Sequence, residues 1–116
     1  MNRKEQLDQL IESLDQLVNI LRHDKNCQWA LHFEGRLQEA KRLRERGFEQ
    51  KDLNQLSTAV MSVYGGAGSF NDYAPTVFNK ETGKITVIQG MEELSHCSEL
   101  VYQYALALRA VESKQA

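Results

Sequence analysis

The sequence has too few cysteines and too little excess charge for several common classes of protein. Its 116 residues include only two cysteines, Cys27 and Cys97, which cannot form a disulfide framework, so a reducing cytoplasm is the simplest location. Fourteen basic residues against sixteen acidic ones give a net charge of −2. That balance argues against bulk attraction to nucleic acid or to anionic lipid. We therefore expect a cytoplasmic protein with no nucleic-acid partner and no membrane partner.

The sequence also lacks long apolar runs. No stretch approaches the roughly 20 consecutive apolar residues that a membrane-spanning helix needs. The N-terminal sequence MNRKEQLDQLIESLDQL has neither a continuous apolar core nor a small-residue cleavage site, which argues against a secretion signal. The composition, 41% apolar and 26% charged, is that of an ordinary globular protein. The length predicts one domain over residues 1–116.

What the sequence does contain is a helical pattern of apolar residues, which predicts four helices. The first is expected from about residue 4 to about residue 23, because its apolar residues recur at spacings of three and four. The second is expected to begin after an N-cap at Asn26 and to end at Gly47, and the third is expected around Leu53 to Tyr64. The fourth, from Glu92 to Val111, has the clearest pattern, since two apolar series there recur every seven residues. The predicted fold is mainly α, a four-helix bundle-like domain.

One glycine lies inside the second predicted helix. At an interior helical position such as Gly35, glycine costs up to ~1 kcal/mol relative to alanine. We expect the missing side chain to allow a close crossing with another helix.

Residues 65–90 interrupt the helical pattern between the third and fourth helices. This insertion contains the only proline, Pro75, and five of the seven glycines. The stretch TVFNKETGKITVI has β-favouring residues on both sides of a turn that ends at Gly83, which predicts a short β-hairpin between helices 3 and 4. Because an isolated two-stranded hairpin is only marginally stable in water, we expect it to lie against the helices.

The insertion begins with a glycine-rich stretch, VYGGAGSFNDY at residues 63–73, which suggests either a phosphate cradle or a forced turn. A phosphate cradle needs backbone N–H groups at the N-terminus of a helix. Here the glycines follow a helix, whose C-terminal end carries partial negative charge. The spacings of the P-loop and of G-x-G-x-x-G are also not met.

A structured turn is therefore the expected conformation of this stretch. Gly65 or Gly66 would end the third helix, and Gly68 would supply another position with positive φ. Short polar side chains would accept hydrogen bonds from the exposed backbone amides of the loop. These side chains are Ser69, Asn71 and Asp72.

The run from Tyr64 to Asp72, with Trp29 and Ala30 upstream of it, resembles the signature of a family of small bacterial proteins with no assigned activity. That signature is a helix ending in tyrosine, followed by Gly-Gly-x-Gly-Ser, an apolar residue and Asn-Asp. Short bacterial proteins of this kind are often immunity partners of polymorphic toxins. The resemblance therefore implies a chain that binds a toxin, and it assigns no catalytic residue.

Acidic residues gather on one face of the first predicted helix, at Glu5, Asp8, Glu12 and Asp15. Each pair of like charges at such spacings costs a few tenths of a kcal/mol. The face is either simply solvated near a helix N-terminus, where acids are favoured, or a patch that complements a basic partner such as a nuclease toxin. The residues expected to contact a partner are Asp8, Glu12 and Asp15 on this helix and Ser69, Phe70, Asn71, Asp72 and Tyr73 in the loop.

No pattern of residues predicts a metal site or a catalytic centre. His23 and Cys27 are four apart, but a helix break is expected between them, and no C-x-x-C or H-x-x-x-H pair exists. Cys97 lies on the apolar face of the fourth helix, where a thiol is unreactive. Ser69 lacks the Gly-x-Ser-x-Gly context of a nucleophile. We expect no metal, no cofactor and no catalytic residue.

Three classes of function remain. The first is a non-enzymatic immunity protein that neutralises a cognate toxin by direct contact, through the acidic face and the Gly65–Tyr73 loop. The second is an enzyme or a small-ligand or nucleotide binder that uses the Gly65–Asp72 loop. The third is a structural homodimer or larger homo-oligomer, in which a second copy completes the wide apolar helix faces. The first is the function that we predict.

Overall fold

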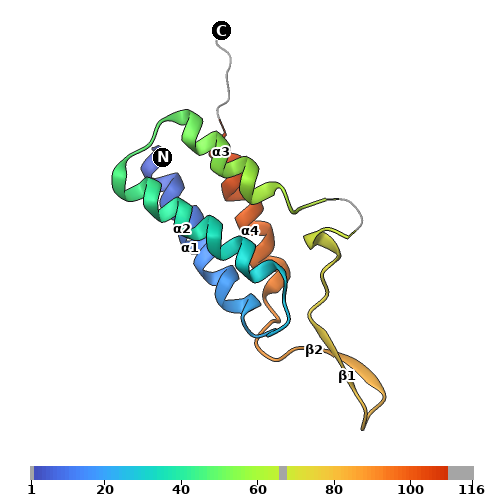
Figure 1. Cartoon of the computed structure of the whole chain (residues 1–116). Coiled ribbons are helices and arrows are strands. Elements are labelled where there is room, and N and C mark those ends of the chain that lie inside the picture. The colour runs from blue at the N-terminus through green and yellow to red at the C-terminus, as the bar shows by residue number, and fades with distance from the viewer. Residues whose placement is uncertain (1, 66–67, 110–116) are drawn as a thin grey trace.

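The computed structural model describes residues 2–65 and 68–109. Within them the chain forms four α-helices with a two-stranded antiparallel hairpin between the third and the fourth (Figure 1). The elements are α1 (Arg3–Leu21), α2 (Trp29–Arg46), α3 (Gln50–Met61), a 3-10 turn (Phe70–Asp72), β1 (Thr76–Asn79), β2 (Lys84–Val87) and α4 (Leu94–Ala107). The prediction of a mainly α, four-helix bundle-like fold with a hairpin between helices 3 and 4 is confirmed.

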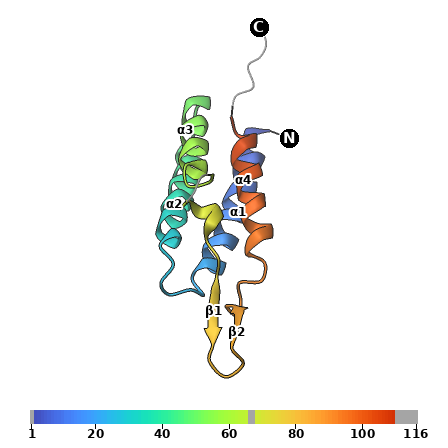
Figure 2. The ribbon, with the colours of Figure 1, turned by 90° about the vertical axis from the view of Figure 1, so that its right-hand side faces the viewer.

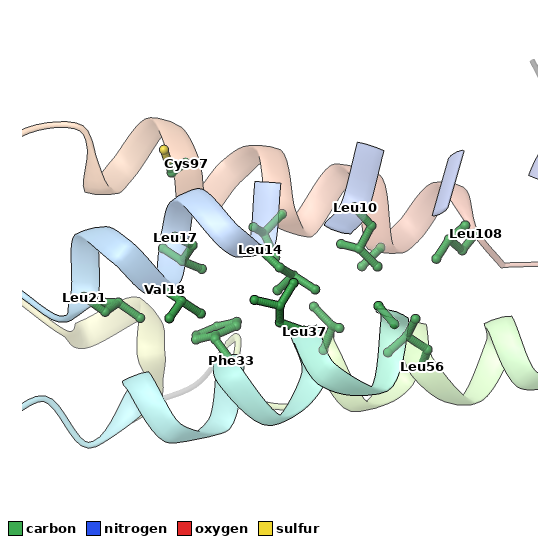
Figure 3. Close-up of a cluster of buried hydrophobic side chains, with 14 of the residues drawn as sticks. Leu10, Leu14, Leu17, Val18, Leu21, Phe33, Leu37, Leu56, Cys97 and Leu108 are labelled. Atoms are coloured by element: carbon green, nitrogen blue, oxygen red, sulfur yellow. The ribbon is translucent and has the colours of Figure 1, made fainter. Parts of the chain in front are cut away.

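The four helices pack as a ring. α1 packs against α2 and α4, and α3 packs against the same two helices, so α1 and α3 lie on opposite corners (Figure 2). The apolar face of each helix points into the centre of this ring (Figure 3), where each fully buried Leu or Phe contributes about 1.5–3 kcal/mol. The largest fully buried side chains of the helices are Leu7, Leu10, Leu14, Leu17, Leu21, Phe33, Leu53 and Leu56.

Hydrogen bonds close the end of the bundle where the chain begins and α4 ends. The guanidinium of Arg3 donates to the carbonyl oxygens of Ala107 at 2.8 Å and of Arg109 at 3.2 Å. The side-chain amide of Gln50 donates to the carbonyl of Leu108 at 2.7 Å. These bonds satisfy carbonyl groups that have no partner within the last turn of a helix.

Several predicted helix boundaries differ from those of the structure. α1 ends at Leu21 rather than near residue 23, and α2 begins after Gln28 rather than after Asn26, although Gly47 caps its end as expected. α3 ends at Met61 instead of continuing to Tyr64, and α4 begins at Leu94 rather than at Glu92. The predicted end of the fourth helix at Val111 lies outside the described residues. In the part of the chain that the structure describes, no helix combines the length and the apolar character needed to cross a membrane.

The hairpin projects from one end of the bundle, so the expectation that it lies against the helices is wrong (Figures 1 and 2). Every residue of both strands is exposed except Asn79, which is half-buried. The core-forming faces of the helices are already buried against one another, so the hairpin has no share in covering them.

The base of the hairpin, in contrast, is firmly attached. The backbone N–H of Ile88 donates to the carbonyl of Pro75 at 2.7 Å, and Met91 is buried in the core. The returning chain passes so close to His23 that a Cβ on Gly90 would lie 2.7 Å from the imidazole ring. Gly90 also has φ +93°, a conformation that favours glycine. The hairpin therefore leaves the bundle from a fixed base.

Gly35 does not mark a close helix crossing, contrary to the sequence-based expectation. A Cβ added there would meet no atom within 4 Å. Gly35→Ala is therefore expected to raise the free energy of unfolding by about 0.5–1 kcal/mol, because alanine loses less backbone entropy on folding and meets no obstacle. Urea denaturation measures this change.

The matched control is Gly47→Ala, at the end of α2. Gly47 has φ +98°, so alanine there is strained and is expected to lower the free energy of unfolding. A Gly35→Ala variant no more stable than the original chain would contradict the open surroundings of this position.

Candidate functional site

The glycine-rich loop is held together by its own polar side chains. The side-chain oxygen of Asn71 accepts a short hydrogen bond from the backbone N–H of Gly65. The carboxylate of Asp72 accepts from the N–H of Gly68 at 2.6 Å, and the hydroxyl of Ser69 accepts from the N–H of Asn71 at 3.2 Å. The expectation that these three side chains bond the loop amides is confirmed. A bound phosphate would need the amides of Gly65 and Gly68 as donors, but both already donate to side chains of the loop.

The two described glycines of the loop have positive φ, +86° at Gly65 and +78° at Gly68. The positive φ expected at Gly68 is confirmed. Gly65 does not end the third helix as expected, because α3 stops at Met61 and is followed by a turn in which the N–H of Tyr64 donates to the carbonyl of Met61. Gly66, the other predicted end of the helix, lies outside the described residues.

Phe70 was predicted as a partner contact, but the structure buries it. Its side chain is 4% exposed and lies in a cluster of aromatic rings. Its ring centroid is 4.8 Å from that of Phe33, 5.4 Å from that of Tyr64 and 5.8 Å from that of Trp29. Phe70 therefore anchors the loop to the bundle, and only a small part of its ring remains accessible.

Tyr73 joins the loop to the connection between α1 and α2. Its hydroxyl donates a 2.5 Å hydrogen bond to the carboxylate of Asp24. Burial raises the pKa of Tyr73 well above its ordinary value, and the bond to Asp24 raises it further. Of the five loop residues expected to contact a partner, only Asn71 and Asp72 are exposed, while Ser69 and Tyr73 are half-buried.

A pocket of about 500 Å³ opens between this loop and α4. That volume is within the range of roughly 300–1,000 Å³ that is usual for ligand sites. The turn after α3 contributes Tyr64 to its wall, and the loop contributes Gly65 and Asn71. Helix α4 contributes four polar side chains, which are Ser95, Ser98, Glu99 and Tyr102.

Two tyrosines form a corner of the pocket. The rings of Tyr64 and Tyr102 lie 5.1 Å apart at 64° to each other. The hydroxyl of Tyr64 donates to the carbonyl of Ser98 at 2.9 Å. Burial, assisted by the nearby negative charge of Glu99 and opposed by the hydrogen bond with Ser98, raises the pKa of Tyr64 to about 12.

The four polar pocket residues of α4 were not singled out from the sequence. The signal was present, because residues 95, 98, 99 and 102 follow one another at spacings of three, one and three, and so share one face of the helix. That face lies beside the apolar one and looks like an ordinary solvated surface in the sequence. Only the loop opposite it makes it the wall of a pocket.

The raised pKa of Tyr64 has a measurable consequence for stability at alkaline pH. In the unfolded chain a tyrosine ionises near pH 10, whereas folded Tyr64 keeps its proton up to about pH 12. Between these values the unfolded state binds fewer protons, so the free energy of unfolding falls as the pH rises, by about 2–3 kcal/mol in all. Tyr64→Phe is expected to remove that part of the fall.

Urea denaturation from about pH 8 to about pH 12 measures this effect, with Tyr104→Phe as the control. Equal alkaline losses in the original chain and in Tyr64→Phe would show that the Tyr64 hydroxyl ionises as easily in the folded as in the unfolded protein.

The acidic face of α1 lies on another side of the bundle. Asp8 pairs with Arg44 of α2, with 2.7 Å between the carboxylate Oδ1 and the guanidinium Nε, while Glu12 and Asp15 are exposed. The pocket lies between α4 and the end of α3, and α3 is on the opposite corner of the ring from α1. The structure therefore does not bring the two predicted contact regions together.

The described residues offer little for metal or thiol chemistry. No three His, Cys, Asp or Glu side chains among them are grouped so that they could hold a metal ion. Cys97 is buried, and burial raises the pKa of its thiol. A higher pKa leaves less of the reactive thiolate at neutral pH.

Comparison with known families covers the central part of the chain. Residues 22–83 match the model of a family described as a domain of unknown function, DUF6966. The matched segment, a little more than half of the chain, contains α2, α3, the glycine-rich loop and β1. No curated protein and no solved structure was found to match the chain. The chain belongs to the DUF6966 family.

Proposed function

We propose that this chain is a non-enzymatic binding protein, and that its partner is another protein, which docks on the hairpin and on the neighbouring pocket. The observation that carries the proposal is the exposed apolar face of the hairpin. The pairing of Phe78 with Ile85 and of Thr76 with Val87 puts these side chains on one face. Phe78 is 62% exposed, Ile85 69% and Val87 49%.

Such a face is unfavourable in a protein that has no partner. Apolar surface left in water forgoes about 25 cal/mol per Å² of stabilisation. A two-stranded hairpin also leaves unpaired backbone groups along both edges, which can pair with another chain. A partner that covers the apolar face of this hairpin removes both costs.

The hairpin alone is too small to be the whole interface. Its exposed apolar side chains offer only a few hundred Å², whereas a stable complex buries about 800 Å² on each partner. The pocket supplies the natural extension, because its wall includes Tyr73, which lies just before β1. Its tyrosine, serine, glycine and asparagine residues are the types that dominate protein-recognition loops, since they combine rigid aromatic area with adaptable hydrogen bonding.

The resemblance of residues 64–72 to small bacterial proteins suggests what the partner is. We propose that the partner is a bacterial toxin and that the chain acts as an immunity protein, which occludes the toxin by direct contact in the cytoplasm. Hairpin and pocket, which Tyr73 links along the chain, together offer the kind of surface that such occlusion needs.

Co-expression tests this proposal directly. Tagged full-length protein is used to isolate its partner, and the partner is then expressed in bacteria with and without this chain. Rescue from the lethality of one toxin-domain protein, together with a one-to-one complex of the purified pair, is the expected result. A partner that is equally toxic with the chain present would contradict the proposal. A concentration-dependent mass near twice 13.3 kDa, with no partner recovered, would favour the structural homo-oligomer instead.

The acidic face of α1 is tested in the same assay. Glu12→Lys and Asp15→Lys reverse two exposed charges that have no ion pair among the described residues. Loss of partner binding in this double variant would extend the interface around the bundle to α1. Retained binding would restrict the contact to the side of the hairpin and the pocket.

The volume of the pocket favours a second candidate function, the binding of a small ligand beside the glycine-rich loop. A screen of nucleotides and metabolites by thermal denaturation tests it, because a ligand that binds only the folded state raises the melting temperature. A substantial rise with one compound, abolished by a change in the pocket wall, would favour this function over the binding of a toxin.

A further inference from the structure

We propose that the pocket between the glycine-rich loop and α4 binds an organic cation, and that the cation is the guanidinium or ammonium group of an arginine or lysine side chain on the protein partner. The source of the cation rests on the function proposed above. The chemistry of the pocket does not, because it follows from the residues of the wall.

The charge of the wall is the first part of the argument. Glu99 is the only charged side chain among the described residues that line the pocket. The side-chain amide of Gln103 donates to its Oε2 at 2.8 Å, and no lysine, arginine or histidine pairs with Glu99 in the described part of the chain. Its negative charge reaches into the pocket, since it raises the pKa of Tyr64. A cation in the pocket would neutralise this carboxylate, whereas a phosphate or carboxylate ligand would be repelled.

The aromatic wall is the second part. Tyr64 and Tyr102 meet at a steep angle, and the wall continues with Phe70 and Tyr73, whose rings are stacked 6.1 Å apart. The faces of aromatic rings carry negative charge density and attract ammonium and guanidinium groups. Tyr64 keeps its proton at neutral pH, so the attraction comes from the ring itself.

The shape and place of the pocket point to a side chain of the partner. Its volume of about 500 Å³ is ample for an extended arginine or lysine. It lies beside the base of the hairpin, so a partner seated on Phe78 and Ile85 can reach it. Arginine is also enriched among the residues that dominate binding energy, and these residues typically fill pockets in the partner.

The test begins with the full-length protein and a small probe. N-acetyl-arginine amide is titrated into isotopically labelled protein, with N-acetyl-citrulline amide as the uncharged analogue of nearly the same shape. We expect the arginine probe to bind with millimolar affinity, at least about fivefold more tightly than the citrulline probe, and to shift the backbone signals of Gly65, Ser98 and Tyr102.

Three variants test which residues bind the arginine probe. Glu99→Gln and Tyr102→Leu are each expected to weaken binding of the arginine probe about threefold to tenfold, with unchanged thermal denaturation. Glu12→Gln, which removes an exposed charge on α1, is expected to leave it unchanged. The assignment of the pocket to a cation would be overturned if the two probes bound equally tightly. It would also be overturned if the arginine probe bound Glu99→Gln as tightly as it binds the original protein.

Binding of the protein partner is then measured to identify the source of the cation. If Glu99→Gln weakens partner binding, and no change in the hairpin restores it, the partner's own side chain occupies the pocket. Unchanged partner binding, in a protein that still prefers the arginine probe, would overturn the partner side chain as the source and leave a free organic amine. The probe titration stands even if no toxin is found, so failure of the proposed function and failure of the cation site are told apart.

Discussion

Changing Phe78 and Ile85 to serine is expected to weaken binding of the protein partner at least about a hundredfold. Two large side chains at the centre of an interface contribute about 2 kcal/mol or more each, and serine cannot replace their apolar area. Both side chains are exposed in the free protein and belong to strands that stand away from the bundle. The free energy of unfolding of the helices is therefore expected to change by less than about 0.5 kcal/mol.

The chain offers a matched control for this experiment in Leu31 of α2. Leu31 is 79% exposed and belongs neither to the hairpin nor to the pocket wall, so Leu31→Ser removes apolar surface from outside the proposed interface. Binding of the partner, measured by titration calorimetry, is expected to be unchanged in this variant. A Phe78→Ser, Ile85→Ser protein that binds as tightly as the original would exclude the hairpin from the interface.

The second large effect is expected for Phe70→Ala, and it concerns stability. Phe70 is buried among Phe33, Tyr64 and Trp29. Removal of such a ring leaves a cavity that the bundle can fill only in part, so the free energy of unfolding is expected to fall by about 3–5 kcal/mol. Urea denaturation followed by the fluorescence of Trp29, the only tryptophan, measures this loss.

Phe78→Ala is the control, because it makes the same chemical change at an exposed site of the same insertion. It is expected to leave the free energy of unfolding nearly unchanged and to weaken partner binding, which is the reverse of the expectation for Phe70→Ala. A loss below about 1 kcal/mol in Phe70→Ala would show that the loop is not an integral part of the folded bundle. Hydrogen exchange of the loop amides would then show it opening on its own.

The helices were predictable because each depends on the residues of a single segment. Leu7, Leu10, Leu14, Leu17 and Leu21 recur at helical spacing, and that spacing alone commits one face of α1 to a core. The hydrogen bonds of the glycine-rich loop were predictable for the same reason. Asn71 and Asp72 lie within a few residues of the amides of Gly65 and Gly68 that they bind.

The roles of Phe70 and of the hairpin could not be predicted from neighbouring residues. An aromatic residue in a polar loop suits a partner contact as well as an anchor, and only the position of Phe33 and Trp29 on another helix decides between them. The hairpin was expected to lie on the helices because an isolated hairpin is marginal. Whether helical surface remains to cover it depends on how completely the four helices bury one another.

The pocket shows most clearly which features follow from the sequence alone and which depend on the tertiary structure. The sequence by itself determined four helices, one hairpin and a loop that satisfies its own amides, because these features depend on periodicity and on short-range hydrogen bonds. The tertiary structure alone decided that Glu99, Tyr102 and Tyr64 line one pocket and that Phe78 and Ile85 are exposed to water. These outcomes depend on packing between segments far apart in the chain, and no local pattern records which of two similar faces another segment will cover.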